Sequence, residues 1–541
     1  MKDHRLRAPS TDGALLAVPP LAEIASILPG SAAWQNRWNH DFQGRRSVWL
    51  RKHLRREVIA AASDFLKQHG LDAPAERPQN GVEPGPPLVV TGHQPELFHP
   101  GVWVKNFAAA AIARAHRGLG LNLIVDNDLP KSSSVRVPAI NGDQTRTLRI
   151  EFDRWKGEQP YEDLMVNDET LFASFGGRVS EVLTGIVADP IIRDFWPDVI
   201  RRSKSGFPLG LRLALARRGL EAAWGVSNLE IPLSRLCQSE GFLWFACHLM
   251  AHLPRFQELH NQALAEYRAL YKIRSKNHPV SALGQAGQWR EAPFWVWRQG
   301  QPRRHPLMVR QDRHSMLLRI DGEDDPLLEL PLSPDREACC AVERLRELPG
   351  RSIRLRTRAL TTTMFCRILL GDLFIHGIGG ARYDELGDSV AARFFGTQPP
   401  PFLTLSMTAW LGLPDQPDSA QELARMNHDL RDLRFNPDRH LSEPVDSQTR
   451  KLIVAKQEAI AQEGNTRKAR IARFHAIREI NQQLQDHVKH QFVLLQEQQA
   501  DALKGLARNR ITRNREYAFV LHSAQRLHEL MTRLPIVPSQ K

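Results

Sequence analysis

The segment between residues 88 and 128 limits the possible folds more than any other part of the sequence. It reads "LVVTGHQPELFHPGVWVKNFAAAAIARAHRGLGLNLIVDND" and begins with an apolar run, followed by a short loop that contains two histidines. An alanine-rich helical pattern comes next, and a second apolar run then ends in acidic residues. This order of strand, loop, helix and strand predicts a βαβ unit and therefore a sheet with parallel strands.

The patterns on either side of this unit divide the chain into further regions. Apolar and aromatic residues at helical spacing precede it, and they are joined to it by a linker rich in Pro and Gly at residues 72–87. Short apolar or alternating runs separated by charged turns predict a small antiparallel β insertion. We therefore expect an α/β core that is split by this insertion. The predicted regions are residues 1–86 (N-terminal helices and linker), 87–285 (first part of the core), 286–348 (β insertion), 349–415 (second part of the core) and 416–541 (helical coiled coil).

The C-terminal region differs in composition, since Gln, Arg, Glu, Ala and Leu dominate from about residue 418 onward. Apolar residues recur there at steps of three or four, which is the spacing of a coiled-coil seam on a long helix. Gly464 and Asn465 lie between two helical stretches and predict the turn of an antiparallel helical hairpin. The predicted seam residues are Phe474, Ile477, Ile480, Leu484, Val488, Phe492 and Leu495.

Composition limits the class of protein and its partners. The net charge of +13 and the pI near 9.8 favour an anionic partner, which could be nucleic acid, a phosphorylated substrate or a membrane surface. The five cysteines contain no CxxC pair, which argues against a disulfide framework or a zinc ribbon. The N-terminus does not read as a secretory signal, and the sequence has no apolar run of about 18 residues. We therefore expect a cytoplasmic protein without a membrane span.

The first candidate ligand loop is "TGHQPELFHPG", which joins the predicted strand to the helix. Such loops lie at the carboxyl ends of strands in open α/β sheets, and the amides of the following helix N-terminus favour an anion. Thr91 and Gly92 begin the loop, His93 and Gln94 are placed to donate to a phosphate, and Lys105 could reach it from the helix. The alternative is a tight turn in which the histidines cap backbone groups and the lysine is solvated. No complete Walker A or GxGxxG pattern is present.

The second candidate is "VDND", at the end of the next predicted strand. Asp126 and Asp128 flank Asn127, and such a group could bind a metal, an amine or a ribose hydroxyl. An Asx-type turn after the strand is the alternative. Its position one βα unit after the first loop favours a ligand role.

The third candidate is "HGIGGARYDEL", again between an apolar strand and a helix. Its glycines would let backbone amides approach a ligand closely, although such turns also occur without ligands. Arg382 near the helix start could pair with a phosphate or carboxylate. The candidate ligand residues of this loop are Gly377, Gly379, Gly380, Arg382, Tyr383 and Asp384.

Other motifs carry weaker predictions. Arg354, Arg356 and Arg358 alternate, which fits the solvated face of a strand, with a phosphate cradle as the alternative in which Arg358 is a ligand residue. Cys366 lies in an apolar setting and is predicted to be a core thiol. The segment "RSKNHP", which starts at Arg274 and includes Asn277 and His278, could lie at the edge of a site or could simply end a helix.

These segments, in this order, resemble the bacillithiol biosynthesis cysteine-adding enzyme family. The family's core begins with a strand and a "TGQQ..LF..GP" loop, to which "VVTGHQPELFHPGVWVKN" is similar. Its later "lRP...q" run, "lP..aYv.GPgE..Y" strand and glycine loop, and "fg..mP" segment look like "LRTRALTTTMFCRILLGDLFIHGIGGARYDEL" and "FFGTQPPPFLTLS". The resemblance spans most of the chain in architecture and is close in letters only in the first loop.

The resemblance implies a Rossmann-like core and an elongated helical hairpin that supports dimers. It also implies a ligase-like reaction that joins cysteine to the amine of glucosaminyl malate. Two departures affect the acidic positions: Asn127 stands where the family's "EDHD" has its histidine, and Gly380 replaces the acid of the "GPGE" turn. The residues that match the family's loops are Thr91, Gly92, His93 and Gln94 in the first, and Gly377, Gly379 and Tyr383 in the second.

Two functions from different classes are expected, the first implied by the resemblance and the second by the basic coiled coil. The first is a carbon–nitrogen ligase that acts on a small-molecule substrate with a nucleotide, ATP or ADP, as a possible cofactor and with no assigned metal. In it backbone amides, His93 and Arg382 would stabilise phosphate charge, and Asp126 or Asp128 would orient an amine or a metal. The second is a non-catalytic scaffold whose basic coiled coil binds a partner protein or, less expectedly, nucleic acid. In either case the coiled coil could form a homodimer.

Overall fold

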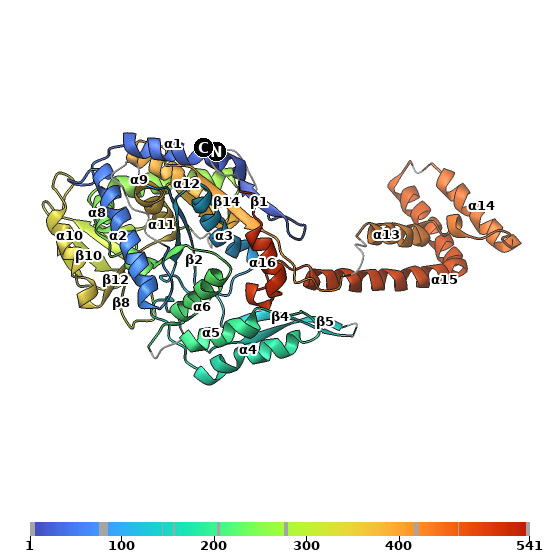
Figure 1. The fold of residues 1–541 in the computed structure, drawn as a ribbon. Helices are drawn as coiled ribbons and strands as arrows, with labels where there is room; N and C mark the ends of the chain where they lie inside the picture. Colours follow the sequence, from blue (N-terminus) through green and yellow to red (C-terminus); the bar gives the residue numbers. More distant parts are fainter. Residues whose placement is uncertain are drawn as a thin grey trace. The chain divides into compact units, whose positions relative to one another are not determined.

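The computed structural model describes residues 6–74, 85–142, 144–154, 157–202, 206–274, 280–415, 420–463 and 465–536. The protein has mixed α/β structure, with a sheet that contains parallel strands and a long C-terminal helix (Figure 1). The chain divides into two compact units. The first comprises Met1–Val137, Leu148–Leu411 and Arg515–Lys541, and the second comprises Pro138–Thr147 and Gly412–Asn514.

The first unit is built around a six-stranded sheet with the strand order β1-β14-β13-β2-β3-β6. The strands from β14 to β6 run parallel to one another, and β1 is antiparallel to β14 at one edge. The sheet therefore confirms the parallel arrangement predicted from the βαβ pattern. The strands are β1 (Leu15–Val18), β2 (Leu88–His93), β3 (Leu119–Ile124), β6 (Leu229–Pro232), β13 (Leu373–His376) and β14 (Phe402–Met407).

The connections of this sheet change direction between β13 and β2. Helix α3 (Pro100–Ala115) leads from β2 to β3, whereas helix α12 (Ile378–Phe395) leads from β13 to β14, on the opposite side of the β13–β2 pair. A sheet with such a reversal has a crevice at the carboxyl ends of the two strands, because the loops that leave them diverge. The loops after β2 and β13 thus flank a natural ligand site.

Helices cover both faces of the sheet, which explains why its central strands are mainly apolar. On one face Val90 of β2 belongs to a core cluster with residues of α2 (Ser47–Gln68), α8 (Glu240–Ala251) and α9 (Leu253–Leu270). On the other face α3 packs against β2, β3 and β14. There the ring of Trp103 lies 4.4 Å from that of Phe519 in the C-terminal segment, between ring centroids.

The β insertion forms a second, antiparallel sheet with the order β11-β10-β9-β8-β12 and with β7 paired to β8. The last strand of this sheet, β12, lies after the predicted boundary at residue 348, since its residues Ile353 to Thr357 pair with β8. The strands are β7 (Gln285–Ala286), β8 (Trp289–Arg298), β9 (His305–Gln311), β10 (Met316–Ile320), β11 (Leu328–Leu330) and β12 (Ile353–Thr357).

Strands β4 (Ser134–Asn141) and β5 (Gln144–Glu151) pair with each other as a separate two-stranded hairpin. The α-helices not yet named are α1 (Ile24–Arg37), α4 (Glu169–Leu183), α5 (Ile192–Arg202), α6 (Leu209–Ala223), α7 (Leu233–Leu236), α10 (Cys339–Arg346), α11 (Ala359–Phe365) with a π-helical turn (Cys366–Leu370), and α16 (Ala524–Thr532).

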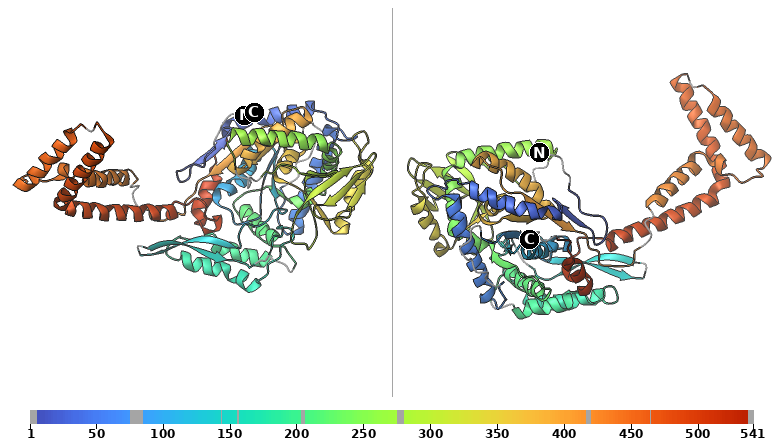
Figure 2. Two further views of the ribbon diagram at one scale, coloured as in Figure 1. Left: turned by 180° about the vertical axis from the view of Figure 1, so that it is seen from behind. Right: turned by 45° about the horizontal axis from the view of Figure 1, so that its top comes forward.

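The second unit consists mainly of helices α13 (Ala420–Phe435), α14 (Ser447–Ala461) and α15 (Arg467–Thr512). Both shorter helices pack against the long α15 (Figure 2). Of the predicted seam, Leu484 and Val488 are buried, whereas Phe474 is 60% exposed. The predicted turn at Gly464 lies outside the described residues.

A histidine cluster joins three segments of the first unit. His40 and His248 contact each other through their Nε2 atoms at 3.2 Å, and His248 Nδ1 and His252 Nε2 lie 3.3 and 3.0 Å from Gln43 Oε1. The Gln43 amide in turn donates to backbone carbonyls in the loop after β11. Every contact is satisfied when the three rings are neutral, with His40 donating to His248. Protonation of His248 would place two donors against each other at Nε2.

We expect this cluster to make the protein less stable in mild acid. Burial lowers the pKa of His40, His248 and His252 below the ordinary 6.5. Because the unfolded chain binds protons more readily, the stability is fully present above about pH 6.5 and is lost as the pH falls below it. Urea unfolding at pH 7.5 and 5.5 should show a smaller drop in the free energy of unfolding for His248→Phe than for wild type. An equal drop in the two proteins would contradict the assignment.

Candidate functional site

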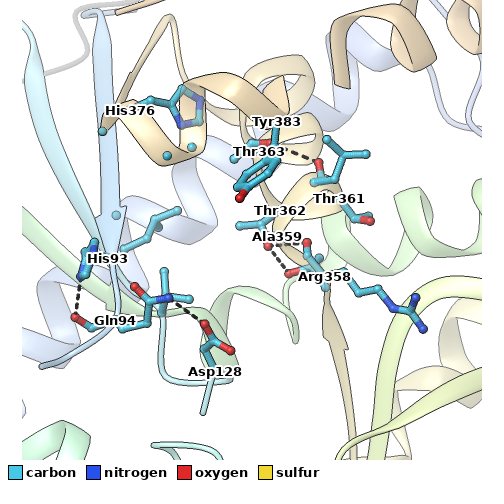
Figure 3. Close-up of a pocket in the computed structure, with 18 of the residues that line it drawn as sticks. His93, Gln94, Asp128, Arg358, Ala359, Thr361, Thr362, Thr363, His376 and Tyr383 are labelled. Atoms are coloured by element: carbon cyan, nitrogen blue, oxygen red, sulfur yellow. Dashed lines mark hydrogen bonds between the residues drawn. The ribbon is translucent and has the colours of Figure 1, made fainter. Parts of the chain in front are cut away.

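A cavity of about 660 Å³ lies at the carboxyl ends of the strands beside the reversal point, and all three predicted loops line it (Figure 3). The structure therefore brings together segments that are almost three hundred residues apart in the sequence. The predicted residues that line the cavity are Gly92, His93, Gln94, Lys105, Asn127, Asp128, Arg358, Gly377, Gly379, Gly380 and Tyr383.

Lys105 is the most unusual of these residues. Its side chain is buried, with 3% of the residue exposed, and Nζ donates to the carbonyl oxygen of Gly92 at 2.9 Å. No carboxylate among the described residues pairs with it, and burial lowers its pKa to about 8. A buried ammonium without a counter-ion is costly, because its desolvation is not offset by an opposite charge. The arrangement is suited to a ligand that brings the negative charge.

Two helix N-termini add positive potential to the same cavity. Helix α3 begins at Pro100, and the His99 side chain caps it by accepting from the amide of Gly101 at 3.1 Å, which is the capping role given above as the alternative for the histidines of this loop. Helix α12 begins after Gly377, and no side chain caps its first amides. Free amides and the helix dipole at such a terminus favour an anion. A bound oxyanion would therefore meet both the Lys105 ammonium and the backbone amides of α12.

The hydrogen bonding of His93 differs from the sequence prediction, in which His93 donates to a phosphate. Its Nδ1 lies 3.0 Å from the carbonyl oxygen of Gln94, and only a protonated nitrogen can donate to that oxygen. Burial, followed by the charge of Lys105, lowers the pKa of His93 well below its ordinary value. The ring is thus neutral, and Nε2 carries a lone pair. His93 can accept a hydrogen bond or a proton from a ligand, whereas it does not donate to a phosphate in this tautomer.

The acidic loop after β3 is held by hydrogen bonds. Asp128 accepts from Gln94 Nε2 at 2.7 Å and pairs with Arg304 at 3.1 Å. Asn127 donates to the carbonyl oxygen of Thr357 at 2.8 Å. The β insertion and the core loops thus form one continuous wall, since Arg304 comes from the loop between β8 and β9.

Asp126 lies elsewhere, away from the main cavity. Its carboxylate accepts from the amide and the hydroxyl of Ser234 at 2.9 and 2.5 Å, at the start of α7. It lines a smaller cavity of about 260 Å³, where burial and the neighbouring charge of Glu162 raise its pKa to about 7. The chain turns at residues 126–128 instead of continuing the strand, so Asp126 lines this smaller cavity whereas Asp128 lines the main one.

Three other predicted residues also do not line the main cavity. Thr91 is buried and donates to the carbonyl oxygen of Ile375 at 3.1 Å. Arg382 donates to the carbonyl oxygen of Leu6 at 3.1 Å. Asp384 lies beneath the loop, and the reason is helical periodicity: Tyr383 faces the cavity, whereas its neighbours are rotated by about 100° about α12.

Asp384 belongs to a buried polar group instead. It lies 2.7 Å from His376 and 3.1 Å from Arg367, and it accepts from the Thr363 hydroxyl at 2.5 Å. Burial acts to raise its pKa, but the charges of His376 and Arg367 outweigh it and hold the pKa at about 2. Asp384 thus supports the loop from below.

The alternating arginines of β12 are not solvated as the sequence suggests. Arg356 is 2% exposed and forms an ion pair with Glu162 at 2.7 Å. Cys366 is buried, and burial raises its pKa, in agreement with a core thiol. Asn277 and His278 lie outside the described residues, and Arg274, which is described, does not line the main cavity.

Several residues of the cavity wall have no recognisable signal in the sequence. Arg515 follows the long helix and donates to Ser406 Oγ and the carbonyl oxygen of Met407, both at 2.9 Å. His260 comes from α9 and Trp295 from the β insertion. No local pattern marks these positions, because each reaches the site only through the tertiary fold.

Among the described residues there is no group of three or more His, Cys, Asp or Glu side chains that could hold a metal ion. In the same part of the chain, every helix is too short or too polar to cross a membrane. Neither a protein-family model nor a curated protein matches this chain at a significant level.

Proposed function

We propose that this chain is an enzyme with a Rossmann-like core that binds an oxyanion of its substrate or cofactor in the main cavity and joins a carboxylate to an amine. The reaction type is that of the bacillithiol cysteine-adding family, which the sequence resembles. The observation that carries the proposal is the buried Lys105, which no carboxylate of the described residues neutralises, in a cavity at the reversal point of the parallel strands.

The chemistry follows from the charges of the wall. Lys105 and the uncapped amides of α12 would hold a phosphate or carboxylate and stabilise negative charge that develops on it. His93, neutral and with Nε2 as an acceptor, would receive a hydrogen bond or a proton from an attacking amine. Asp128 is already engaged by Gln94 and Arg304, so its part in this proposal is to position Gln94.

The proposal predicts that His93→Ala weakens ligand binding without unfolding the protein. Calorimetric titration of the full chain with ATP, ADP and cysteine should give a heat of binding for at least one of them. We expect that affinity to fall at least tenfold in His93→Ala, because the variant loses the acceptor Nε2 in the cavity wall. The matched control is His428→Ala, which removes an exposed histidine of α13 and should bind as wild type does.

The reaction itself is tested by mass spectrometry. Incubation of the protein with cysteine, glucosaminyl malate and ATP should yield the condensed product, and omission of each component in turn shows which are required. If none of these ligands binds and no product forms, the enzyme assignment fails and the scaffold function of the helical region is favoured.

A further inference from the structure

The first turns of α15 carry a run of positive charge on the surface of the second unit. From residue 465 to residue 478 the sequence "NTRKARIARFHAIR" has five Lys and Arg residues and no acidic residue. No carboxylate of the described residues forms an ion pair with any of the five. Arg473 is half-buried and donates to the carbonyl oxygen of Gln462 at 3.1 Å, whereas the other four are exposed. The five residues are Arg467, Lys468, Arg470, Arg473 and Arg478.

Two large apolar side chains lie among these charges and are turned to solvent. Phe474 is 60% exposed and Ile471 is 50% exposed. Positions 467, 471, 474 and 478 follow one another at steps of four, three and four, which places them on one face of the helix. The first buried residue of α15 is Asn481, further along the helix. The other helices of the second unit therefore leave this face, which combines cations with apolar groups, open to a partner.

The charge of this face distinguishes among the possible partners. A second copy of the chain would bring the same cations, and a two-fold contact of the face with itself would set like charges against each other. A nucleic acid would neutralise the cations, but its phosphate backbone offers Ile471 no apolar surface. A bilayer with anionic lipids meets both needs, because cations contact its headgroups while apolar side chains enter the boundary between headgroups and acyl chains.

We infer that the start of α15 binds the surface of a membrane that contains anionic lipids. Ile471 and Phe474 enter the boundary between headgroups and acyl chains, and the surrounding Lys and Arg side chains contact the headgroups. The helix lies on the bilayer in this arrangement and does not cross it. A cluster of about four to eight Lys and Arg residues on an amphipathic helix is typical of such recognition. The inference concerns the second unit alone and is independent of the main cavity and of the proposed function.

Sedimentation of the full chain with lipid vesicles tests this inference. Vesicles in which phosphatidylglycerol makes up about one third of the lipid, with phosphatidylcholine as the rest, should bind at least about tenfold more tightly than pure phosphatidylcholine vesicles. The double variant Arg467→Gln/Arg478→Gln should lose at least about tenfold in affinity for the anionic vesicles, because two cations of the face are removed. Ile471→Ser/Phe474→Ser should also lose at least about tenfold, because it removes the apolar groups that enter the bilayer.

The matched control is Leu503→Ser, which changes another exposed apolar residue of the same helix. Leu503 is 50% exposed, but it lies beside the ion pair of Lys504 with Asp501 and outside the basic run. This variant should bind the anionic vesicles as wild type does. Circular dichroism of all variants checks that the helices are retained, which is expected because the replaced side chains are exposed.

Four results would overturn the inference. The first is equal binding of the wild-type protein to neutral and anionic vesicles, and the second is an equal loss in Leu503→Ser and Ile471→Ser/Phe474→Ser. The third is binding of a single-stranded oligonucleotide, weakened in Arg467→Gln/Arg478→Gln, by a wild-type protein that does not bind anionic vesicles; the face would then bind nucleic acid. The fourth is a dimer in analytical ultracentrifugation that Ile471→Ser/Phe474→Ser dissociates while vesicle binding is unchanged, which would make the face a contact between copies.

Discussion

Replacement of Lys105 by methionine is expected to remove anion binding and, at the same time, to make the unliganded protein more stable. Methionine has a similar length and fills the same buried space without a charge. The pKa of Lys105 lies at about 8 instead of 10.5, which corresponds to a destabilisation of about 3 kcal/mol at pH 7. This cost is fully present below about pH 8 and disappears as the pH rises towards 10.5, because the folded protein then releases its proton before the unfolded chain does.

The expected loss of anion affinity and the expected gain in stability have opposite signs. That combination identifies a buried charge whose role is to bind a ligand. Loss of one partner of a buried charge pair costs about 2–5 kcal/mol, so the affinity for pyrophosphate should fall by at least about thirtyfold. Thermal unfolding without ligand should give a higher midpoint for Lys105→Met than for wild type. Lys131→Met is the control, because Lys131 lines the same cavity but its side chain is 71% exposed. A variant that loses stability and keeps its affinity would show that Lys105 is structural.

The meeting of the three loops follows from features that the sequence displays. The apolar runs that end at His93, Ile124 and His376 are long and uniform enough to predict strands that are buried on both faces. Parallel strands end at one edge of a sheet, so loops that follow them lie near one another even when they are far apart in sequence. The sequence patterns therefore indicate which segments line the cavity.

The assignment of single residues within those loops depends on side-chain direction, which the local pattern does not contain. Asp126 and Asp128 look equivalent in the sequence, yet one accepts from Ser234 and the other from Gln94. Arg356 looks like a surface residue of an alternating strand until its buried partner Glu162 is known.

The same limit applies to residues that arrive at the site from elsewhere. His260 and Arg515 lie on helical or irregular segments whose patterns report only their own packing. They become part of the cavity because α9 and the segment after α15 pack against the core. No periodicity in either segment indicates a ligand, and only the tertiary structure shows that these residues line the cavity.

A second large effect is expected at Glu221, which is fully buried between α3 and α6. Its Oε1 accepts from Trp103 Nε1 at 2.6 Å and from Asn106 Nδ2 at 2.8 Å, and its Oε2 accepts from Arg217 at 2.7 Å. Arg217 also pairs with Glu230 at 2.8 Å, so one guanidinium joins two buried carboxylates. In Glu221→Ala the indole and amide donors lose their acceptor, and Arg217 keeps only one of its two partners. We expect a loss of about 3–5 kcal/mol in the free energy of unfolding, measured with urea at pH 7.5.

The control for this prediction keeps the chemistry and changes only the burial. Arg393 makes two hydrogen bonds to Glu266, at 3.1 and 2.5 Å, but the two side chains are 33% and 44% exposed. Water solvates Arg393 when Glu266→Ala removes its partner, so that variant should lose little of its free energy of unfolding. Glu221→Gln should lie between the two variants, because the amide retains an acceptor for Trp103 but cannot balance the charge of Arg217. Similar losses in Glu221→Ala and Glu266→Ala would mean that burial does not determine the strength of these pairs.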